Sequence, residues 1–283
     1  MEKKKTAYSF EVFPPKKTSP VEVIYNTLEQ LKDLNPDFIS VTLGAGGNNG
    51  NLAGHTIKVA AKIKEYGIEP VVHLPCVNFS KSEVSGLLEE MKSNDITKVL
   101  ALRGDKPSDG SPTKNDFTYA SDLVSFIKQK YPSFNVMGAC YPETHLEATS
   151  PEKDIENLKR KVDSGCSGLI TQLFFDNNCF YDFLNRIRQV GINIPVEAGI
   201  MPVTNKNSIE HMITLCGASF PAKFSKVLQK FGNDKDALIT AGINYAVDQI
   251  TDLIANGVDG IHLYTMNNPF VAQRITDAVK GLI

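Results

Sequence analysis

The fold begins with the segment Ser9-Phe10-Glu11-Val12-Phe13-Pro14-Pro15-Lys16. Its apolar residues predict a β-strand. The two prolines then stop the chain from continuing as a strand or a helix, because proline lacks the backbone N–H that both structures need. Glu11 is therefore expected near the tip of a strand. On its own this is a weak signal, since most glutamates are simply solvated.

More apolar runs of strand length follow this segment along the whole chain. We predict eight strands, at residues 8–12, 38–42, 70–74, 98–102, 135–139, 168–172, 195–199 and 260–264. The segments between them show apolar residues at helical spacing, for example Leu28 and Leu31. Alternating strands and helices indicate an α/β protein with a parallel sheet. The count favours a (β/α)8 TIM barrel over an open doubly wound sheet.

The interval between the seventh and eighth predicted strands, residues 200–259, is longer than one helix requires. We expect extra helices there, around residues 207–215 and 222–230, before a final barrel helix near residues 235–255. No linker, charge block or low-complexity tract interrupts the chain. Residues 1–283 are therefore interpreted as a single domain, a size that barrels of this kind commonly have.

Composition and charge exclude several classes of protein. The 283 residues are 42% hydrophobic, which is enough for a full core, and the 30 basic and 32 acidic residues nearly cancel. Neither nucleic acid nor a membrane is therefore expected as a partner. The basic start of the chain is not followed by the apolar stretch of a signal peptide, and no run is long enough to cross a bilayer, so we expect a cytoplasmic protein.

Cysteine and histidine patterns give no sign of a metal. The five cysteines include no C-x-x-C pair, so neither a disulfide framework nor a zinc site is favoured. We expect all five to be buried as small hydrophobic residues. His73 and His145 belong to no H-E-x-x-H pattern, and no metal site is predicted.

Polar residues stand at or just beyond the ends of the predicted strands. In a (β/α)8 barrel the C-terminal ends of the strands form the active site, so side chains that are far apart in sequence are expected to converge there. The residues in these positions are Glu11, Thr42, His73, Arg103, Asp105, Tyr141 and Gln172.

Two of these strand ends suggest particular chemistry. Phe10 and Phe13 flank Glu11, and an apolar setting favours the neutral carboxylic acid, which could donate a proton. The alternative is an ordinary solvated carboxylate. In Arg103-Gly104-Asp105 the glycine permits close approach of a ligand and the arginine could pair with a phosphate. Here the alternative is a surface turn with a salt bridge.

Two further segments could bind a ligand. The glycine-rich loop at residues 44–50 could hold a ligand through its backbone N–H groups. It lacks the third glycine of a dinucleotide fingerprint, and such clusters are usually turns. On the helix after residue 150, Asp154, Asn157 and Lys161 form a row beside the core-facing stripe. This row could hold the phosphates and ribose of a nucleotide, or it could be a solvated face.

Taken together, these segments resemble the methylenetetrahydrofolate reductase family, whose members are flavoenzymes with a (β/α)8 barrel. No single motif is sufficient, but their joint order and spacing are specific. The segments that carry the resemblance are Ser9 to Lys16, Ser40-Val41-Thr42, His73-Leu74, Arg103-Gly104-Asp105, Tyr119 to Leu123, Tyr141-Pro142-Glu143 with His145, Asn157 to Lys161, and Ile170-Thr171-Gln172.

The resemblance implies a reaction and roles for individual residues. Hydride would pass from NADH or NADPH to FAD and then to 5,10-methylenetetrahydrofolate, giving 5-methyltetrahydrofolate for methionine synthesis or one-carbon metabolism. Glu11 would be the general acid that opens the folate ring. Asp105 would lie near the flavin and bind the pterin, Gln172 would contact folate, and Thr42 would contact the nicotinamide. The positions that match FAD-binding residues are Ala45, His73, Arg103, Gly104, Asp105, Tyr119, Ala120, Tyr141, His145, Asp154, Asn157, Arg160 and Lys161.

The chain departs from the family pattern where substrates bind. Leu43 replaces an aromatic residue against the flavin, and Asn268 replaces an arginine that meets the glutamate tail of folate in many relatives. Ser208 and Met212 replace a glutamine and a phenylalanine that touch folate or nicotinamide in some relatives. How the folate tail binds and which electron donor is used are left open by these differences.

The chain ends directly after the last predicted barrel helix. By resemblance it corresponds to the bacterial short form of the family, the catalytic barrel alone. Feedback by S-adenosylmethionine through a C-terminal domain is therefore expected to be absent. A homo-oligomer is expected, and an accessory electron-transfer subunit is a further option.

Two alternative functions remain at this stage. One is a pterin-binding barrel that transfers a one-carbon unit without hydride transfer. The other is a flavin- and folate-binding subunit that receives its electrons through a partner protein.

Overall fold

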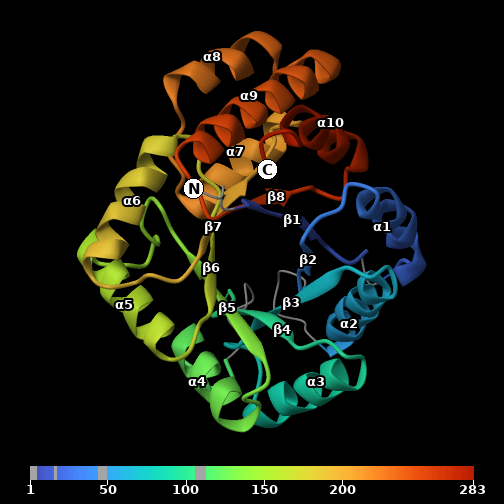
Figure 1. The fold of residues 1–283 in the computed structure, drawn as a ribbon, viewed down its shortest axis with the longest axis vertical. Helices are drawn as coiled ribbons and strands as arrows, with labels where there is room; N and C mark the ends of the chain where they lie inside the picture. Colours follow the sequence, from blue (N-terminus) through green and yellow to red (C-terminus); the bar gives the residue numbers. More distant parts are fainter. Residues whose placement is uncertain (1–4, 16–17, 44–49, 106–112) are drawn as a thin grey trace. The chain divides into compact units, whose positions relative to one another are not determined.

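The described residues form a closed barrel of eight strands in the order β1 to β8, as the sequence predicted. This computed structural model describes residues 5–15, 18–43, 50–105 and 113–283. Each strand pair with a defined register, such as β1 with β2 and β7 with β8, is parallel. The strands are β1 (Ala7–Val12), β2 (Phe38–Val41), β3 (Glu69–Pro75), β4 (Lys98–Leu102), β5 (Asn135–Cys140), β6 (Gly168–Thr171), β7 (Val196–Ile200) and β8 (Gly260–Tyr264) (Figure 1).

Helices alternate with the strands along the chain, and extra helices follow β7 as predicted. The first connection contains the short helix η1 (Val21–Ile24) and α1 (Tyr25–Lys32). The later helices are α2 (Gly50–Glu65), α3 (Lys81–Ser93), α4 (Ala120–Lys130), α5 (Pro151–Asp163), α6 (Asn177–Gln189), α7 (Lys206–Cys216), α8 (Ala222–Phe231), α9 (Lys235–Ala255) and α10 (Pro269–Val279).

The chain divides into two compact units. The β1–β5 unit consists of Ser9–Ala139 and Arg160–Leu169. The β6–β8 unit consists of Met1–Tyr8, Cys140–Lys159 and Ile170–Ile283. The boundaries between the units fall inside β1, α5 and β6, so neither unit is a continuous stretch of sequence. The single-domain interpretation stays a prediction.

In the β1–β5 unit, the strands are covered by one apolar face of each helix. All four residues of β2 are buried. Val84, Leu88 and Met91 recur at helical spacing on α3 and are all buried. Because strands of a parallel sheet are covered on both faces, their residues are almost continuously apolar. This explains why apolar runs located the strands in the sequence.

In the β6–β8 unit, an aromatic cluster holds the extra helices in place. Phe175, which follows β6, stacks on Phe224 of α8 with ring centroids 5.6 Å apart. Tyr245 of α9 packs on the same Phe224 ring at 4.5 Å. Helices α8 and α9 contact each other and lie side by side in Figure 1. The long interval before β8 therefore adds a layer with its own apolar contacts.

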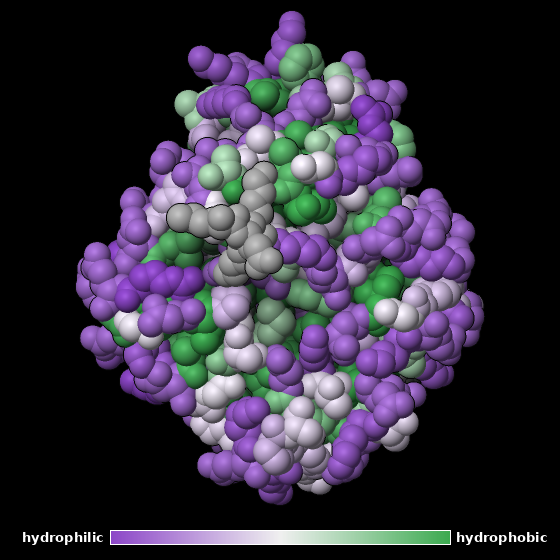
Figure 2. Space-filling view, in the orientation of Figure 1, coloured by the Kyte–Doolittle hydropathy of each residue, from purple (hydrophilic) through white to green (hydrophobic). Residues whose placement is uncertain are grey.

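Apolar residues lie mainly in these cores. On the face seen in Figure 2, hydrophilic residues make up most of the surface, and hydrophobic residues show in smaller groups between them. Within the described ranges, every helix is too short or too polar to span a lipid bilayer. Cys76, Cys140 and Cys166 are buried as predicted. Cys179 and Cys216 are half-buried, so the prediction of full burial is wrong for these two.

Candidate functional site

Predicted site residues lie at or near the C-terminal ends of four neighbouring strands of the β1–β5 unit. The pairs β1–β2, β2–β3 and β3–β4 are parallel, so their C-terminal ends lie at the same edge of the sheet. Glu11 is the second-last residue of β1, Thr42 follows β2, His73 lies in β3, and Arg103 follows β4. The barrel thus places these four residues at or near the ends of adjacent strands.

Glu11 and His73 form a close pair. Glu11 Oε2 lies 3.4 Å from His73 Nε2, and the two side chains are only 20% and 10% exposed. Phe10 beside Glu11 is fully buried, whereas Phe13 is 39% exposed. Because successive side chains of a strand point to opposite faces of the sheet, Phe10 does not enclose the Glu11 carboxyl group. The His73 imidazole faces this carboxyl group from β3.

The backbone of Thr42 is held on two sides. Its N–H donates to Val12 O at 3.0 Å, and its carbonyl accepts from Thr56 Oγ1 of α2 at 3.0 Å. These contacts fix the start of the connection that leads to the glycine-rich loop. Ala45 and most of that loop lie outside the described residues.

The turn after β4 packs against the end of β3. Gly104 has a φ of +82°, and a Cβ at this position would lie 2.7 Å from Pro75 Cβ. Glycine is required here because of this φ and because a side chain would clash with Pro75. Cys76 and Val77 donate backbone hydrogen bonds to Arg103 O, and Asn78 Nδ2 donates to Asp105 O at 3.0 Å. The backbone of Asp105 is thereby fixed while its side chain is exposed.

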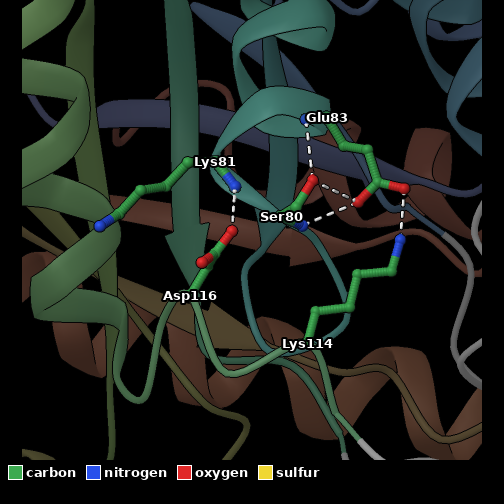
Figure 3. A network of polar contacts seen from close by, with 5 residues as sticks. All are labelled: Ser80, Lys81, Glu83, Lys114 and Asp116. Atoms are coloured by element: carbon green, nitrogen blue, oxygen red, sulfur yellow. Dashed lines mark hydrogen bonds and ion pairs between the residues drawn. The ribbon is translucent and has the colours of Figure 1, made fainter.

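A polar network anchors the segment that leads to Tyr119 and Ala120 (Figure 3). Ser80 and Glu83 form a capping box at the start of α3, and Lys114 forms an ion pair with Glu83. Asp116 Oδ2 accepts from Lys81 N at 2.9 Å. The Lys114 ammonium and the Ser80 N–H hold the pKa of Glu83 at about 2.

Tyr119 and Ala120 lie where this segment enters α4. Asp122 of α4 accepts hydrogen bonds from the backbone N–H of Thr118 and Tyr119, both at 2.9 Å. Ala120 is the first residue of α4 and is buried. The Tyr119 side chain is 55% exposed, so its ring is accessible to a ligand.

The last turn of α5 belongs to the β1–β5 unit and presents two cations. Lys161 Nζ donates a hydrogen bond to the carbonyl oxygen of Ala139, the second-last residue of β5, and the Lys161 side chain is only half-exposed. Lys161 is therefore directed at a strand end rather than at solvent. Arg160 is exposed.

In the β6–β8 unit, Tyr141 and His145 lie together in the loop after β5. Their rings meet edge to face with centroids 4.6 Å apart. Asp154 of α5 accepts from His145 N at 3.0 Å, so its carboxylate positions the loop. Glu147 N donates to His145 Nδ1 at 3.0 Å. Because Nδ1 is an acceptor, the neutral imidazole carries its proton on Nε2, which can donate.

The other predicted residues of this unit are less enclosed. Asn157 is exposed on α5. Gln172 follows β6, where its Oε1 accepts from Leu173 N at 2.9 Å and its backbone N–H donates to Cys140 O at 2.7 Å. The amide oxygen of Gln172 is thus already used, which directs the amide N–H groups toward other partners.

Asn268 has a structural role that explains its identity. Its Oδ1 accepts from Val271 N at 3.2 Å, which makes Asn268 the N-cap of α10, and Pro269 follows at the first helical position. Asparagine at the N-cap and proline after it are typical of helix starts. The sequence signal for this role is the pair Asn268-Pro269, which the sequence analysis interpreted only as a departure from the family pattern.

Neither a metal-binding cluster nor a cavity adds to the candidate site within the described part of the chain. No group of three His, Cys, Asp or Glu side chains among the described residues could hold a metal ion. A cavity of about 460 Å³ at the N-terminal ends of β2 and β3 contains no predicted residue; its lining is Lys32, Asp33, Asn35, Pro36, Tyr66, Gly67 and Ile68. Barrel active sites lie at the opposite end of the strands, so this cavity is not part of the candidate site.

Comparison with known proteins identifies the family. The family model described as "Methylenetetrahydrofolate reductase" matches residues 1–280. The chain belongs to this family. It is 35% identical to 5,10-methylenetetrahydrofolate reductase of Salmonella typhimurium, with 94% of this chain and 88% of that protein covered. The resemblance seen in the sequence motifs is thus confirmed.

Other relatives differ in length or in sequence. Methylenetetrahydrofolate reductase (NADH) 1 of Arabidopsis thaliana is 36% identical over 280 residues, and the chain spans about half of its length, 47%. A solved structure of an uncharacterized Clostridium thermocellum protein, described as binding two copies of 5-methyl-5,6,7,8-tetrahydrofolic acid, superposes with a TM-score of 0.65. It covers 99% of this chain and 95% of its own chain, but at 15% identity it supports the fold alone.

Proposed function

We propose that this protein reduces 5,10-methylenetetrahydrofolate to 5-methyltetrahydrofolate with FAD as the bound cofactor and NADH or NADPH as the electron donor. The observation that carries the proposal is the Glu11–His73 pair at the C-terminal ends of β1 and β3. A mostly enclosed carboxyl group beside an imidazole is suited to donate one proton and to be protonated again. Membership of the family supplies the substrate class.

The residues present fit FAD, a dinucleotide with a pyrophosphate and several hydroxyl groups. Lys161 and Arg160 offer positive charge for phosphates. His145 offers an N–H donor, since its Nδ1 is used as an acceptor. The proposed FAD-binding set keeps the residues expected from the family motifs, including Ala45, His73, Arg103, Gly104, Tyr119, Ala120, Tyr141, Asp154 and Asn157.

In the proposed reaction, Glu11 holds a proton on its carboxyl oxygen and delivers it to a nitrogen of the five-membered ring of methylenetetrahydrofolate. The bond between this nitrogen and the methylene carbon then breaks, and the methylene carbon becomes part of a cationic iminium group on the other nitrogen. FAD, when bound, relays a hydride from the nicotinamide to this carbon. The nicotinamide thus loses two electrons, and the methylene group becomes a methyl group.

Other residues are proposed to position the reactants. Asp105 binds the pterin and stabilises the cation through its negative charge. Its anchored backbone and exposed carboxylate suit this role. Gln172 contacts folate through its amide N–H groups, and Thr42 contacts the nicotinamide.

The plant relatives are named as NADH enzymes, which favours NADH as the donor. We further propose a cytoplasmic enzyme that acts as a homo-oligomer, with an accessory electron-transfer subunit as an option.

An anaerobic titration tests the proposal. The purified protein should carry a flavin whose visible absorbance bleaches on addition of NADH or NADPH. Adding methylenetetrahydrofolate should restore the absorbance and give 5-methyltetrahydrofolate. A bound flavin that neither nucleotide reduces would instead indicate a subunit that receives electrons through a partner. A protein that binds folate but no flavin would indicate one-carbon transfer without hydride chemistry.

A further inference from the structure

We propose that Glu143 is a positioning residue, which holds the loop that carries His145 by tethering it to the segment between α7 and α8. The inference rests on the proposed function because it assigns His145 to FAD. Every residue of this tether belongs to the β6–β8 unit. The loop is residues 141–149, between β5 and α5, and the other segment is residues 217–221.

The first contact of the tether is a charge-assisted hydrogen bond. Glu143 Oε2 accepts from Ser219 N at 2.8 Å, although the two residues are 76 positions apart. A carboxylate that accepts from an N–H forms a stronger hydrogen bond than two neutral groups do. This bond therefore joins the loop to the α7–α8 segment rather than to its own neighbours.

The second contact is apolar and lies nearby. Gly217 ends α7 with a φ of +69°, and a Cβ at this position would lie 2.3 Å from Leu146 Cδ2. The Leu146 side chain therefore rests on the Cα of Gly217. Glu143 and Leu146 flank His145 on the loop, so the two contacts bracket the proposed FAD donor.

The loop needs such support. Thr144, between Glu143 and His145, has a φ of +77°, which costs a non-glycine residue on the order of 1 kcal/mol and persists only where the surroundings enforce it. Within the described residues, Glu143 Oε1 is buried without a hydrogen-bond partner. An unpaired buried oxygen and a strained backbone both lower the stability of the folded protein, and such features are expected where a geometry serves function. Glu143 thus enforces the loop conformation at some cost in folding stability.

The test compares three variants of the full-length, FAD-loaded protein. Glu143→Ala should release FAD on dilution at least about tenfold faster, which corresponds to about 1.4 kcal/mol. Glu143→Gln keeps an oxygen that can accept from Ser219 N but loses the charge, so it should release FAD at a rate between those of wild type and Glu143→Ala. Glu210→Ala removes the same charge from the exposed face of α7 and should have no effect.

Hydrogen exchange of residues 141–149, measured without flavin, supplies an independent readout. Glu143→Ala should speed this exchange. Leu146→Ala removes the second contact and should also speed it, so this variant supplies the test if Glu143→Ala does not fold. Unchanged exchange and unchanged FAD release would overturn the tether. If Glu143→Gln released FAD as fast as Glu143→Ala, the hydrogen bond from Ser219 N would not be the basis of the tether. A wild-type protein that binds no FAD would overturn the proposed function, and the exchange data alone would then decide on the tether.

Discussion

Glu11 has a partner that gives the proposed acid a route to regain its proton. His73 Nε2 lies 3.4 Å from Glu11 Oε2. In the proposed reaction, once Glu11 has delivered a proton, the imidazole can return one. Both side chains are mostly enclosed, so exchange with bulk water at this carboxylate is restricted. The pair therefore places the proposed proton donor, Glu11, beside the group that can protonate it again, His73.

We predict that Glu11→Gln keeps FAD bound and still allows reduced nicotinamide to reduce it. Reduction of methylenetetrahydrofolate should slow by about 10²–10⁴-fold, because the amide preserves the shape but cannot deliver a proton. Stopped-flow measurement of the two half-reactions separates these steps. Glu22→Gln, at an exposed glutamate of η1, is the matched control. A wild-type rate of folate reduction in Glu11→Gln would show that the acid is another group.

The sequence located many site residues but not their contacts. Strand ends could be recognised because two prolines follow Glu11 and because apolar runs stop at Thr42 and Arg103. The Glu11–His73 pair could not be predicted, since it depends on which strands are neighbours and in which register. The same holds for Glu143 and Ser219, whose contact crosses 76 positions. Such pairs leave no spacing pattern in a single sequence.

At the scale of secondary-structure elements, α5 contributes a cation that the structure directs inward. Lys161 donates to Ala139 O, whereas Lys153 on the same helix is exposed and pairs with Glu156. We predict that Lys161→Ala weakens FAD retention and makes it more sensitive to salt, because a charge-assisted contact to phosphate is lost. Lys153→Ala is the control and should retain FAD like wild type.

Flavin content after dialysis at low and at high salt measures this effect. Lys161→Ala also removes a donor from the end of β5, so its thermal unfolding must be followed in parallel. A lower melting temperature with unchanged flavin content would assign Lys161 a structural role only.

Helix α9 is seated by a close contact of its backbone. A Cβ at Gly242 would lie 1.8 Å from Val203 O, which is backbone and cannot move aside like a side chain. Gly242→Ala should therefore destabilise the protein by about 1–3 kcal/mol or more. Gly54 of α2 has open space around its Cα, and Gly54→Ala should stabilise by about 0.5–1 kcal/mol because alanine favours helices. Urea unfolding of both variants checks the opposite signs, and equal effects would contradict this account of α9.

At the scale of the whole molecule, the sequence was sufficient for the architecture. Residues 98–102 and 260–264 were predicted as strands with the bounds of β4 and β8, and the helix predicted at residues 235–255 coincides with α9. This succeeded because strands of a barrel are buried on both sides and helices on one, so each leaves its own period of apolar residues. The division into two compact units had no such signal, because its boundaries cut through β1, α5 and β6.

The two ends of the chain meet in the β6–β8 unit, where the start of β1 contacts β8 and α10. Ala7 N donates to Asp259 O at 3.1 Å, just before β8, and the Tyr8 hydroxyl lies 2.9 Å from Thr276 Oγ1 of α10. Tyr8 is only 2% exposed. Burial raises the pKa of Tyr8 from 10.0 to about 12, and the bond to Thr276 lowers it by less.

This pKa predicts how stability depends on alkaline pH. Below pH 10 the phenol is neutral in both the folded and the unfolded chain, so its contribution is fully present. Between pH 10 and about 12 only the unfolded chain ionises, so stability falls, by up to about 1.4 kcal/mol per pH unit from this group. Tyr8→Phe lacks the ionisable group, so wild type should lose stability more steeply than Tyr8→Phe over this range.

Urea unfolding at a series of pH values tests the comparison. Near pH 8 Tyr8→Phe should be less stable than wild type by only about 0.5–1.5 kcal/mol, because Thr276 Oγ1 also donates to Ala272 O at 2.8 Å and keeps a partner. Tyr119→Phe, at an exposed tyrosine, controls for the loss of a phenol as such. Since all other titrating groups are common to wild type and Tyr8→Phe, only Tyr8 can make their two curves converge as the pH rises. Curves that stay parallel from pH 8 to 12 would show that the Tyr8 hydroxyl is not held in a buried site at the junction of the chain ends.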